Sequence, residues 1–173
     1  EKDALAQIET ITVDNARLVS NLHANLGGLY RMNGHPDLAR EHMEKSISLL
    51  DQFNLLHIND SIPQIANYAM FLTEQQEPER GISELQKLSG IIKEYHSDDC
   101  LDYAKVQETL GTIYLMTANL PQAKTHFKRA FKIYEKIWAD EPEMIEAKYQ
   151  EIQELYPQIG FCIGKTLSGL LTK

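Results

Sequence analysis

The chain has 173 residues, 43% of them hydrophobic and 24% charged, so it is long enough to bury a core of its own. Its formal net charge of −8 disfavours phosphate-backbone partners, so we expect no nucleic-acid binding. The two cysteines, Cys100 and Cys162, are too few for a secreted disulfide scaffold and have no metal-like spacing. The low cysteine count favours a reducing compartment, so we expect a cytoplasmic protein. No apolar run reaches about 18 residues, so we expect no membrane-spanning helix and no membrane partner.

Three segments of the chain align without a gap at a spacing of 42 residues, beginning at Asn25, Asn67 and Thr109. Residues at the same position of the three segments form a column of this alignment. Some columns hold small residues, which let two helices approach closely, and others hold large apolar residues one helical turn away. The small columns are Gly27, Ala69, Gly111 and Ala39, Gly81, Ala123; the large ones are Tyr30, Leu72, Tyr114 and Met43, Leu85, Phe127.

Each repeat predicts a helix, a short turn and a second helix, with Gly34, Pro78 and Pro121 in or beside the turns. In chain order we expect the end of a preceding second helix at 1–10 and helix pairs at 16–33 with 37–53, 61–75 with 78–95, and 100–117 with 120–138. Two terminal helices follow at 142–155 and 158–171. We expect a single domain over 1–173. It consists of the end of a helix at 1–10, the repeats at 16–53, 61–95 and 100–138, and the terminal helices at 142–171. Because the chain begins inside a repeat and lacks an initiator Met, we expect it to be a fragment of a longer protein.

The columns resemble the tetratricopeptide repeat, most fully at Leu110, Gly111 and Tyr114 in the first helix and Ala123 and Phe127 in the second. The usual period of that family is about 34 residues. The 42-residue period is similar to its kinesin-light-chain type, as is the segment 129–142, RAFKIYEKIWADEP. The resemblance implies an all-α fold, a right-handed superhelix of antiparallel helix pairs (an α-solenoid).

The resemblance also implies that the first helix of each pair lines a concave groove that holds a peptide or a helix of another protein. An asparagine amide there can bracket a backbone amide of the ligand, and methionine adapts to varied apolar side chains. For Asn25, a hydrogen bond within the scaffold is the alternative. The groove residues implied are Asn21, Asn25, Arg31, Met32, Asn67, Met70, Lys105, Thr109 and Thr112.

One subclass of the family binds acidic chaperone C-termini through a carboxylate clamp, which needs Lys and Asn where this chain has Ala24 and Gly28. Thr109 also stands where the clamp needs Arg. We therefore expect no chaperone-tail binding.

A search for chemistry finds no combination of nucleophile, base or metal ligands, so we expect no enzyme activity, no cofactor and no metal. The six histidines are scattered, and we expect surface or turn positions for them. The segment 160–166 is one residue short of a phosphate-binding loop, and a helix containing two glycines is the preferred interpretation.

The sequence thus predicts an interaction scaffold that binds a protein or peptide in its groove. Two alternatives remain open. The chain could be the peptide-sensing regulatory domain of a larger signalling protein, or it could self-associate through its C-terminal helix, where Phe161, Ile163 and Leu167 are apolar.

Overall fold

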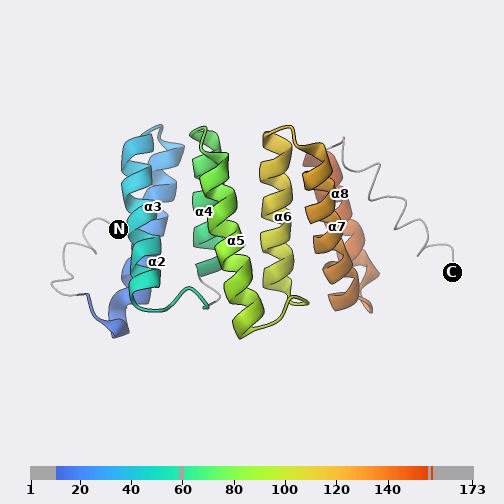
Figure 1. Ribbon diagram of the computed structural model, residues 1–173, viewed down its shortest axis with the longest axis horizontal. Coiled ribbons are helices and arrows are strands. Elements are labelled where there is room, and N and C mark those ends of the chain that lie inside the picture. Colours follow the sequence, from blue (N-terminus) through green and yellow to red (C-terminus); the bar gives the residue numbers. More distant parts are fainter. Residues whose placement is uncertain (1–10, 59–60, 156, 158–173) are drawn as a thin grey trace. The chain divides into compact units, whose positions relative to one another are not determined.

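The computed structural model describes residues 11–58, 61–155 and 157, and these contain seven helices and no strand (Figure 1). The expectations for residues 1–10 and 158–171, the self-association surface and the 160–166 segment lie outside the described residues. The start of α2, at Val13 instead of residue 16, is the largest departure from the expected helix ends. The helices are α2 (Val13–Met32), α3 (Pro36–Gln52), α4 (Ser61–Glu74), α5 (Pro78–Tyr95), α6 (Leu101–Met116), α7 (Leu120–Ile137) and α8 (Pro142–Leu155).

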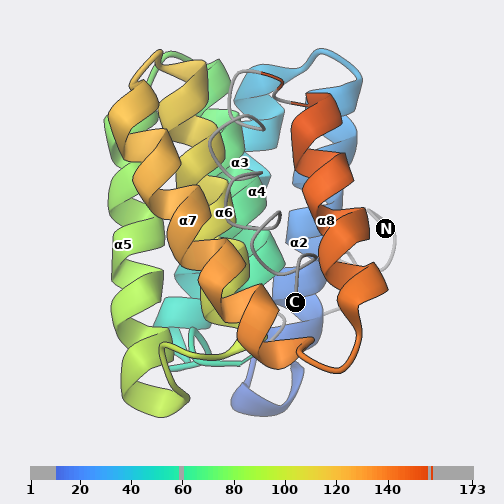
Figure 2. The ribbon, with the colours of Figure 1, turned by 90° about the vertical axis from the view of Figure 1, so that its right-hand side faces the viewer.

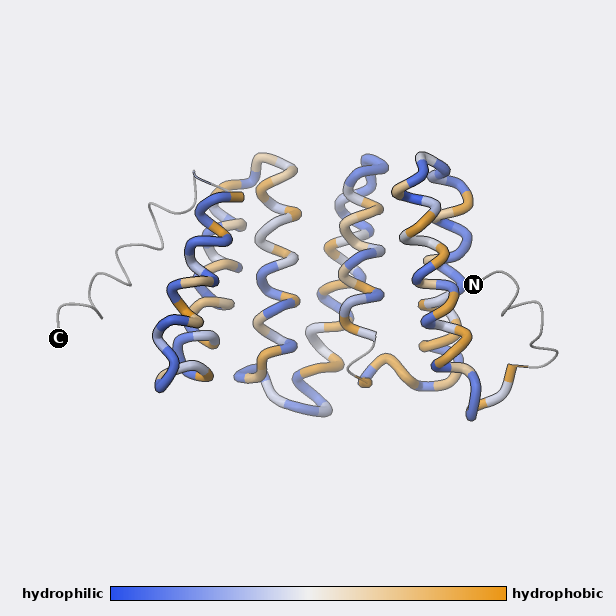
Figure 3. Tube along the Cα trace, turned by 180° about the vertical axis from the view of Figure 1, so that it is seen from behind, coloured by the Kyte–Doolittle hydropathy of each residue, from blue (hydrophilic) through white to orange (hydrophobic). Residues whose placement is uncertain are grey.

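The chain divides into two compact units, with the boundary between His96 and Ser97. In unit 1, α2 packs against α3 and α4 against α5, while α2 and α3 both contact α4. Figure 1 shows α3 and α5 in a layer in front of α2 and α4. Hydrophobic and hydrophilic positions alternate along these helices, as expected for helices with one buried face (Figure 3).

In unit 2, α7 packs against both α6 and α8, and a tight turn joins α7 to α8 (Figure 2). Phe127, Ala130 and Tyr134 on α7 are fully buried, as is Ile152 on α8. The Tyr134 hydroxyl donates to Glu108 Oε2 at 2.6 Å, and Lys148 Nζ lies 2.9 Å from Glu108 Oε1. This polar cluster connects α6, α7 and α8.

The expected small columns bring the two helices of a repeat together. A Cβ atom on Gly27 would lie 2.6 Å from Met43 Cγ, and one on Gly111 would lie 2.8 Å from the Phe127 ring. A Cβ atom on Gly81 would lie 2.6 Å from the backbone oxygen of Ala69. Real side chains cannot approach so closely, so the contact between α4 and α5 depends on the absence of a side chain at Gly81.

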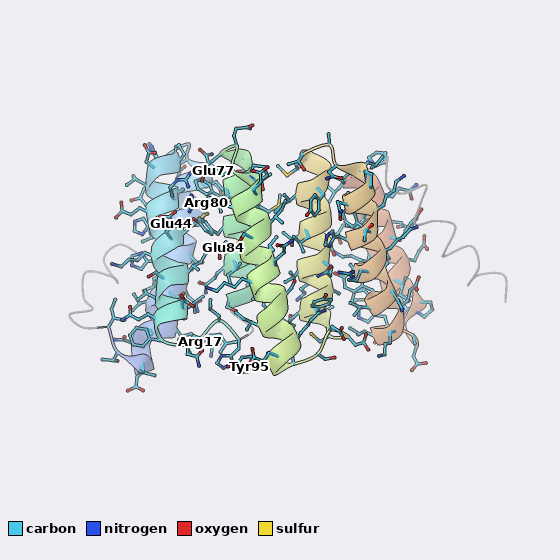
Figure 4. The ribbon with its side chains drawn as sticks, viewed as in Figure 1. Arg17, Glu44, Glu77, Arg80, Glu84 and Tyr95 are labelled. Carbon is cyan, nitrogen blue, oxygen red and sulfur yellow. The ribbon has the colours of Figure 1, made fainter. Side chains whose placement is uncertain are left out.

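A cluster of ion pairs connects α3 to α5 on the front layer of unit 1 (Figure 4). Arg40 and Arg80 each donate to Glu77 at 2.6 Å, and Arg80 also lies 3.4 Å from Glu44. The Tyr68 hydroxyl donates to Glu44 at 2.8 Å. Burial and this hydrogen bond raise the pKa of Tyr68, so the tyrosine stays protonated and keeps donating.

Candidate functional site

A cavity of about 390 Å³ lies in unit 1, where α2 and α4 approach each other over α3. The space beside Gly28 on α2 is open, since a Cβ atom on this glycine would meet nothing within 4 Å. Small residues on this face of α2 leave the hollow unfilled. Met32, beside it, is 84% exposed and contributes an apolar wall. The residues that line the cavity are Ala24, Gly28, Arg31, Met32, Met43, Ser46, Gln64, Asn67 and Glu74.

The floor of the cavity is polar and buried. Gln64 Oε1 accepts hydrogen bonds from the hydroxyls of Ser20, at 2.7 Å, and Ser46. Gln64 Nε2 donates to Asn21 Oδ1 at 2.5 Å. Ser20 and Ser46 are fully buried and Gln64 is 8% exposed, so these groups are satisfied by one another rather than by bulk water.

An ion pair closes one side of the cavity. Arg31 on α2 donates through Nε to Glu74 Oε2 on α4 at 2.8 Å, and through a second nitrogen to Glu74 Oε1. The two side chains are 32% and 37% exposed, so the pair contributes about 1 kcal/mol or less to stability. Its main effect at the cavity is that the two charges cancel.

The predicted groove residues of unit 1 separate into three groups. Arg31, Met32 and Asn67 line the cavity, and Asn21 supports its floor through Gln64. Asn25 is exposed but does not line the cavity, so only Asn67 of the two asparagines expected to share a column lies there. Met70 is half-buried on α4 and also lies outside the lining.

The predicted groove residues of unit 2 hydrogen-bond or pair within their own helix. The hydroxyl of Thr109 donates to the carbonyl of Lys105 at 3.0 Å, and that of Thr112 donates to the carbonyl of Glu108 at 3.1 Å. Lys105 Nζ lies 3.8 Å from Asp102. Every residue that lines the cavity belongs to unit 1, so these three contribute nothing to it.

Sequence reasoning did not predict the other residues that line the cavity as part of a site: Ala24, Gly28, Met43, Ser46, Gln64 and Glu74. Ala24 and Gly28 were noticed only as departures from a carboxylate clamp. A signal for the floor was present in the repeat columns, where Ser20, Ser46 and Gln64 stand at positions that are apolar in the other repeats.

The expectation that all histidines occupy surface or turn positions is wrong for His23, His42 and His126, which are half-buried between helices. The Nδ1 atoms of His23 and His42 lie 2.8 Å apart, so one ring donates and the other accepts. The Tyr30 ring stacks on His42 at 5.3 Å, and Tyr114 stacks on His126 at 5.2 Å in the matching columns of the third repeat. Burial, followed by the charge of His42, lowers the pKa of His23, and burial with Arg129 lowers that of His126.

In the described ranges, no three His, Cys, Asp or Glu side chains are placed to hold a metal ion. No helix in the same part of the chain is both long and apolar enough to cross a bilayer.

Comparison with known proteins gives a family match and a fold match. Residues 61–136, which run from α4 to α7, match the family model described as tetratricopeptide repeat. A crystal structure of BtubC (BKLC) from P. vanneervenii is similar over 96% of this chain and 68% of that one, with a TM-score of 0.71 and 16% sequence identity. At this identity the likeness shows the fold alone, an all-α solenoid of helix pairs. No curated protein sequence matches the chain.

Proposed function

Residues 61–136 are tetratricopeptide repeats, which generally serve as protein-interaction scaffolds, and from this premise we propose that unit 1 binds an extended peptide of a partner protein. One side chain of that peptide enters the cavity between α2 and α4. The observation that carries the proposal is the preformed hollow over Gly28, which no side chain of the described residues fills. Cavities that hold a small ligand group are typically concave, largely apolar and formed before the ligand arrives, and one peptide side chain is a group of that size.

The surroundings of the hollow suit a peptide. Asn67 is exposed at the cavity and carries both a donor and an acceptor, the pair needed to hydrogen-bond a backbone amide. Met32 offers an exposed and flexible apolar surface on the opposite helix. The net charge of −8 favours a protein partner over nucleic acid. We therefore propose binding rather than catalysis, and we retain the cytoplasmic location that the cysteine count of the sequence predicts.

Gly28→Leu tests the proposal by filling the hollow. Leucine fits the open space and has a higher helix propensity than glycine, so the variant should fold at least as well as the wild type. Gly90→Leu is the matched control, because Gly90 lies in α5 with equally open space around it and does not line the cavity. Circular dichroism checks the helix content of both variants.

The ligand source is a displayed library of random 12-residue peptides selected on the wild-type protein. We expect selected peptides to lose at least about tenfold in affinity for Gly28→Leu, the result of losing one well-packed side chain, and to keep full affinity for Gly90→Leu. Equal affinity for the wild type and folded Gly28→Leu would refute binding in this cavity.

A further inference from the structure

The polar floor of the cavity is confined to one place in the repeat array. Ser20, Ser46 and Gln64 form it, and the residues of the later repeats in the same columns are apolar and buried. They are Ile62 and Ala104 for Ser20, Leu88 and Ala130 for Ser46, and Val106 for Gln64. The fold therefore packs these positions without polar atoms elsewhere in the same chain.

Polar groups in a protein interior cost free energy unless they are fully hydrogen-bonded, and a network that is only partly bonded is worse than an apolar core. A set of polar residues that the fold does not require, and that lies directly under a cavity, is thus a candidate for ligand recognition. Ser46 and Gln64 both line the cavity as well as bonding to each other.

The network fixes the orientation of the Gln64 carboxamide. Its oxygen accepts from two serine hydroxyls, which places its nitrogen on the side away from them. One N–H of that nitrogen donates to Asn21 Oδ1. The second N–H has no protein acceptor among the described residues, so the cavity offers a hydrogen-bond donor of fixed direction at its floor.

The charges around the cavity favour a neutral ligand group. Arg31 and Glu74 pair with each other, which leaves no net charge to offset the desolvation of a buried carboxylate or ammonium. Met32, Met43 and Ala24 are the apolar residues with side chains that line the cavity, and they suit a chain of methylene groups. A side chain that combines an aliphatic stem with a neutral acceptor at its tip matches both features.

We propose that the cavity selects a carboxamide side chain, glutamine or the shorter asparagine, as the anchor of the bound peptide; this inference rests on the function proposed above. The carboxamide oxygen of the ligand accepts from Gln64 Nε2, and its own N–H donates to the hydroxyl oxygen of Ser46. A carboxamide is held at both its oxygen and its nitrogen when a donor and an acceptor stand side by side, and Gln64 Nε2 and the Ser46 hydroxyl supply them.

A triple variant, Ser20→Ala/Ser46→Ala/Gln64→Leu, removes the polar floor. Each replacement is a residue that already stands in the same column of another repeat: Ala104, Ala130 and Leu22. Because Ser20, Ser46 and Gln64 are removed together, none of these buried groups is left without its partner. Asn21 Oδ1 loses the hydrogen bond from Gln64, but Asn21 is only half-buried, so the variant should remain folded. Peptides are selected from the same random library on the wild type and on this variant.

Wild-type binders should share a Gln or Asn, and its replacement by Leu should weaken binding about tenfold or more, because the Gln64 donor is then buried without an acceptor. The triple variant should bind the Leu peptide better than its Gln parent. In ¹⁵N-labelled wild type, the side-chain amide resonances of Gln64 should shift with the Gln peptide and much less with the Leu peptide.

Two kinds of failure are distinguishable. If binding depends on Gly28 but the wild type tolerates Leu in place of Gln or Asn, the carboxamide inference is overturned while the proposed function stands. If binding does not depend on Gly28, both are overturned. The comparison of Gln and Leu peptides on the wild type decides the first point even if the triple variant does not fold.

Discussion

At the scale of single residues, one backbone position recurs in each turn between the two helices of a repeat. Gly34, Gln76 and Ala118 are spaced by 42 residues and have φ values of 73°, 65° and 58°. The residue after each of them donates its backbone N–H to the last turn of the preceding helix, as in Glu77 to the Leu72 carbonyl at 2.8 Å. This is the Schellman arrangement, in which glycine is the least strained residue at the left-handed position.

Replacing Gln76 or Ala118 by glycine should therefore stabilise the protein by about 0.5–1 kcal/mol, because relief of left-handed strain exceeds the added entropy of the unfolded chain. The reverse change, Gly34→Ala, should destabilise it by about 1 kcal/mol. Urea denaturation followed by circular dichroism measures both. A loss of stability in both glycine variants would show that these turns do not adopt the left-handed conformation.

Two glycines of α5 should respond in opposite directions to alanine. A Cβ atom on Gly81 would lie 2.6 Å from the Ala69 carbonyl oxygen, so Gly81→Ala should cost about 1–3 kcal/mol through forced separation of α4 and α5. Gly90 has open space, so Gly90→Ala should gain up to about 1 kcal/mol from helix propensity alone. Thermal denaturation of the two variants would contradict this packing if Gly81→Ala melted no lower than the wild type.

At the scale of helices, the pair of His23 on α2 and His42 on α3 makes stability depend on pH. At least one of the two rings must be neutral to accept the hydrogen bond at 2.8 Å. The charged or titratable groups that surround His23 are His42, Lys45 and Glu41. The pKa of His23 is lowered on folding, as is that of His126, so the unfolded chain binds more protons. The stability from these groups is full above the unfolded value of 6.5 and is lost as pH falls below it.

Urea midpoints measured between about pH 7.5 and 5 should therefore fall as the solution becomes more acidic. His23→Gln should reduce the slope, because it removes one of the two histidines whose pKa is lowered on folding. Glutamine suits the position, since Gln107 in the same column of the third repeat hydrogen-bonds His126 at 2.9 Å. An unchanged slope in this variant would mean that His23 does not titrate on unfolding.

The helix pairs could be predicted from the sequence because periodic columns and turn residues report directly on local structure. Gly27 and Gly111 were expected to permit close approach, and the distances to Met43 and Phe127 confirm it. The cavity could not be predicted in this way, since it is formed by the absence of side chains at Ala24 and Gly28 and by contacts between residues in different repeats. Ser20 and Gln64 are 44 positions apart, and only the fold shows that they hydrogen-bond.

At the scale of the whole molecule, an array of similar helix pairs gains specificity where its repeats differ. The matching columns build the same turns and close contacts in each repeat, while the polar floor, the open Gly28 and the Arg31–Glu74 pair occur together in unit 1. Binding is therefore expected where the periodic pattern is broken rather than where it is kept.

The most direct test is a map of backbone amide shifts in ¹⁵N-labelled protein as a library-selected peptide is added. The largest changes should fall on Gly28, Met32, Gln64 and Asn67, with little change at Gly90 on α5. Changes concentrated instead on the Arg40, Glu44 and Arg80 face of α3 and α5, with the cavity residues unmoved, would contradict peptide binding between α2 and α4.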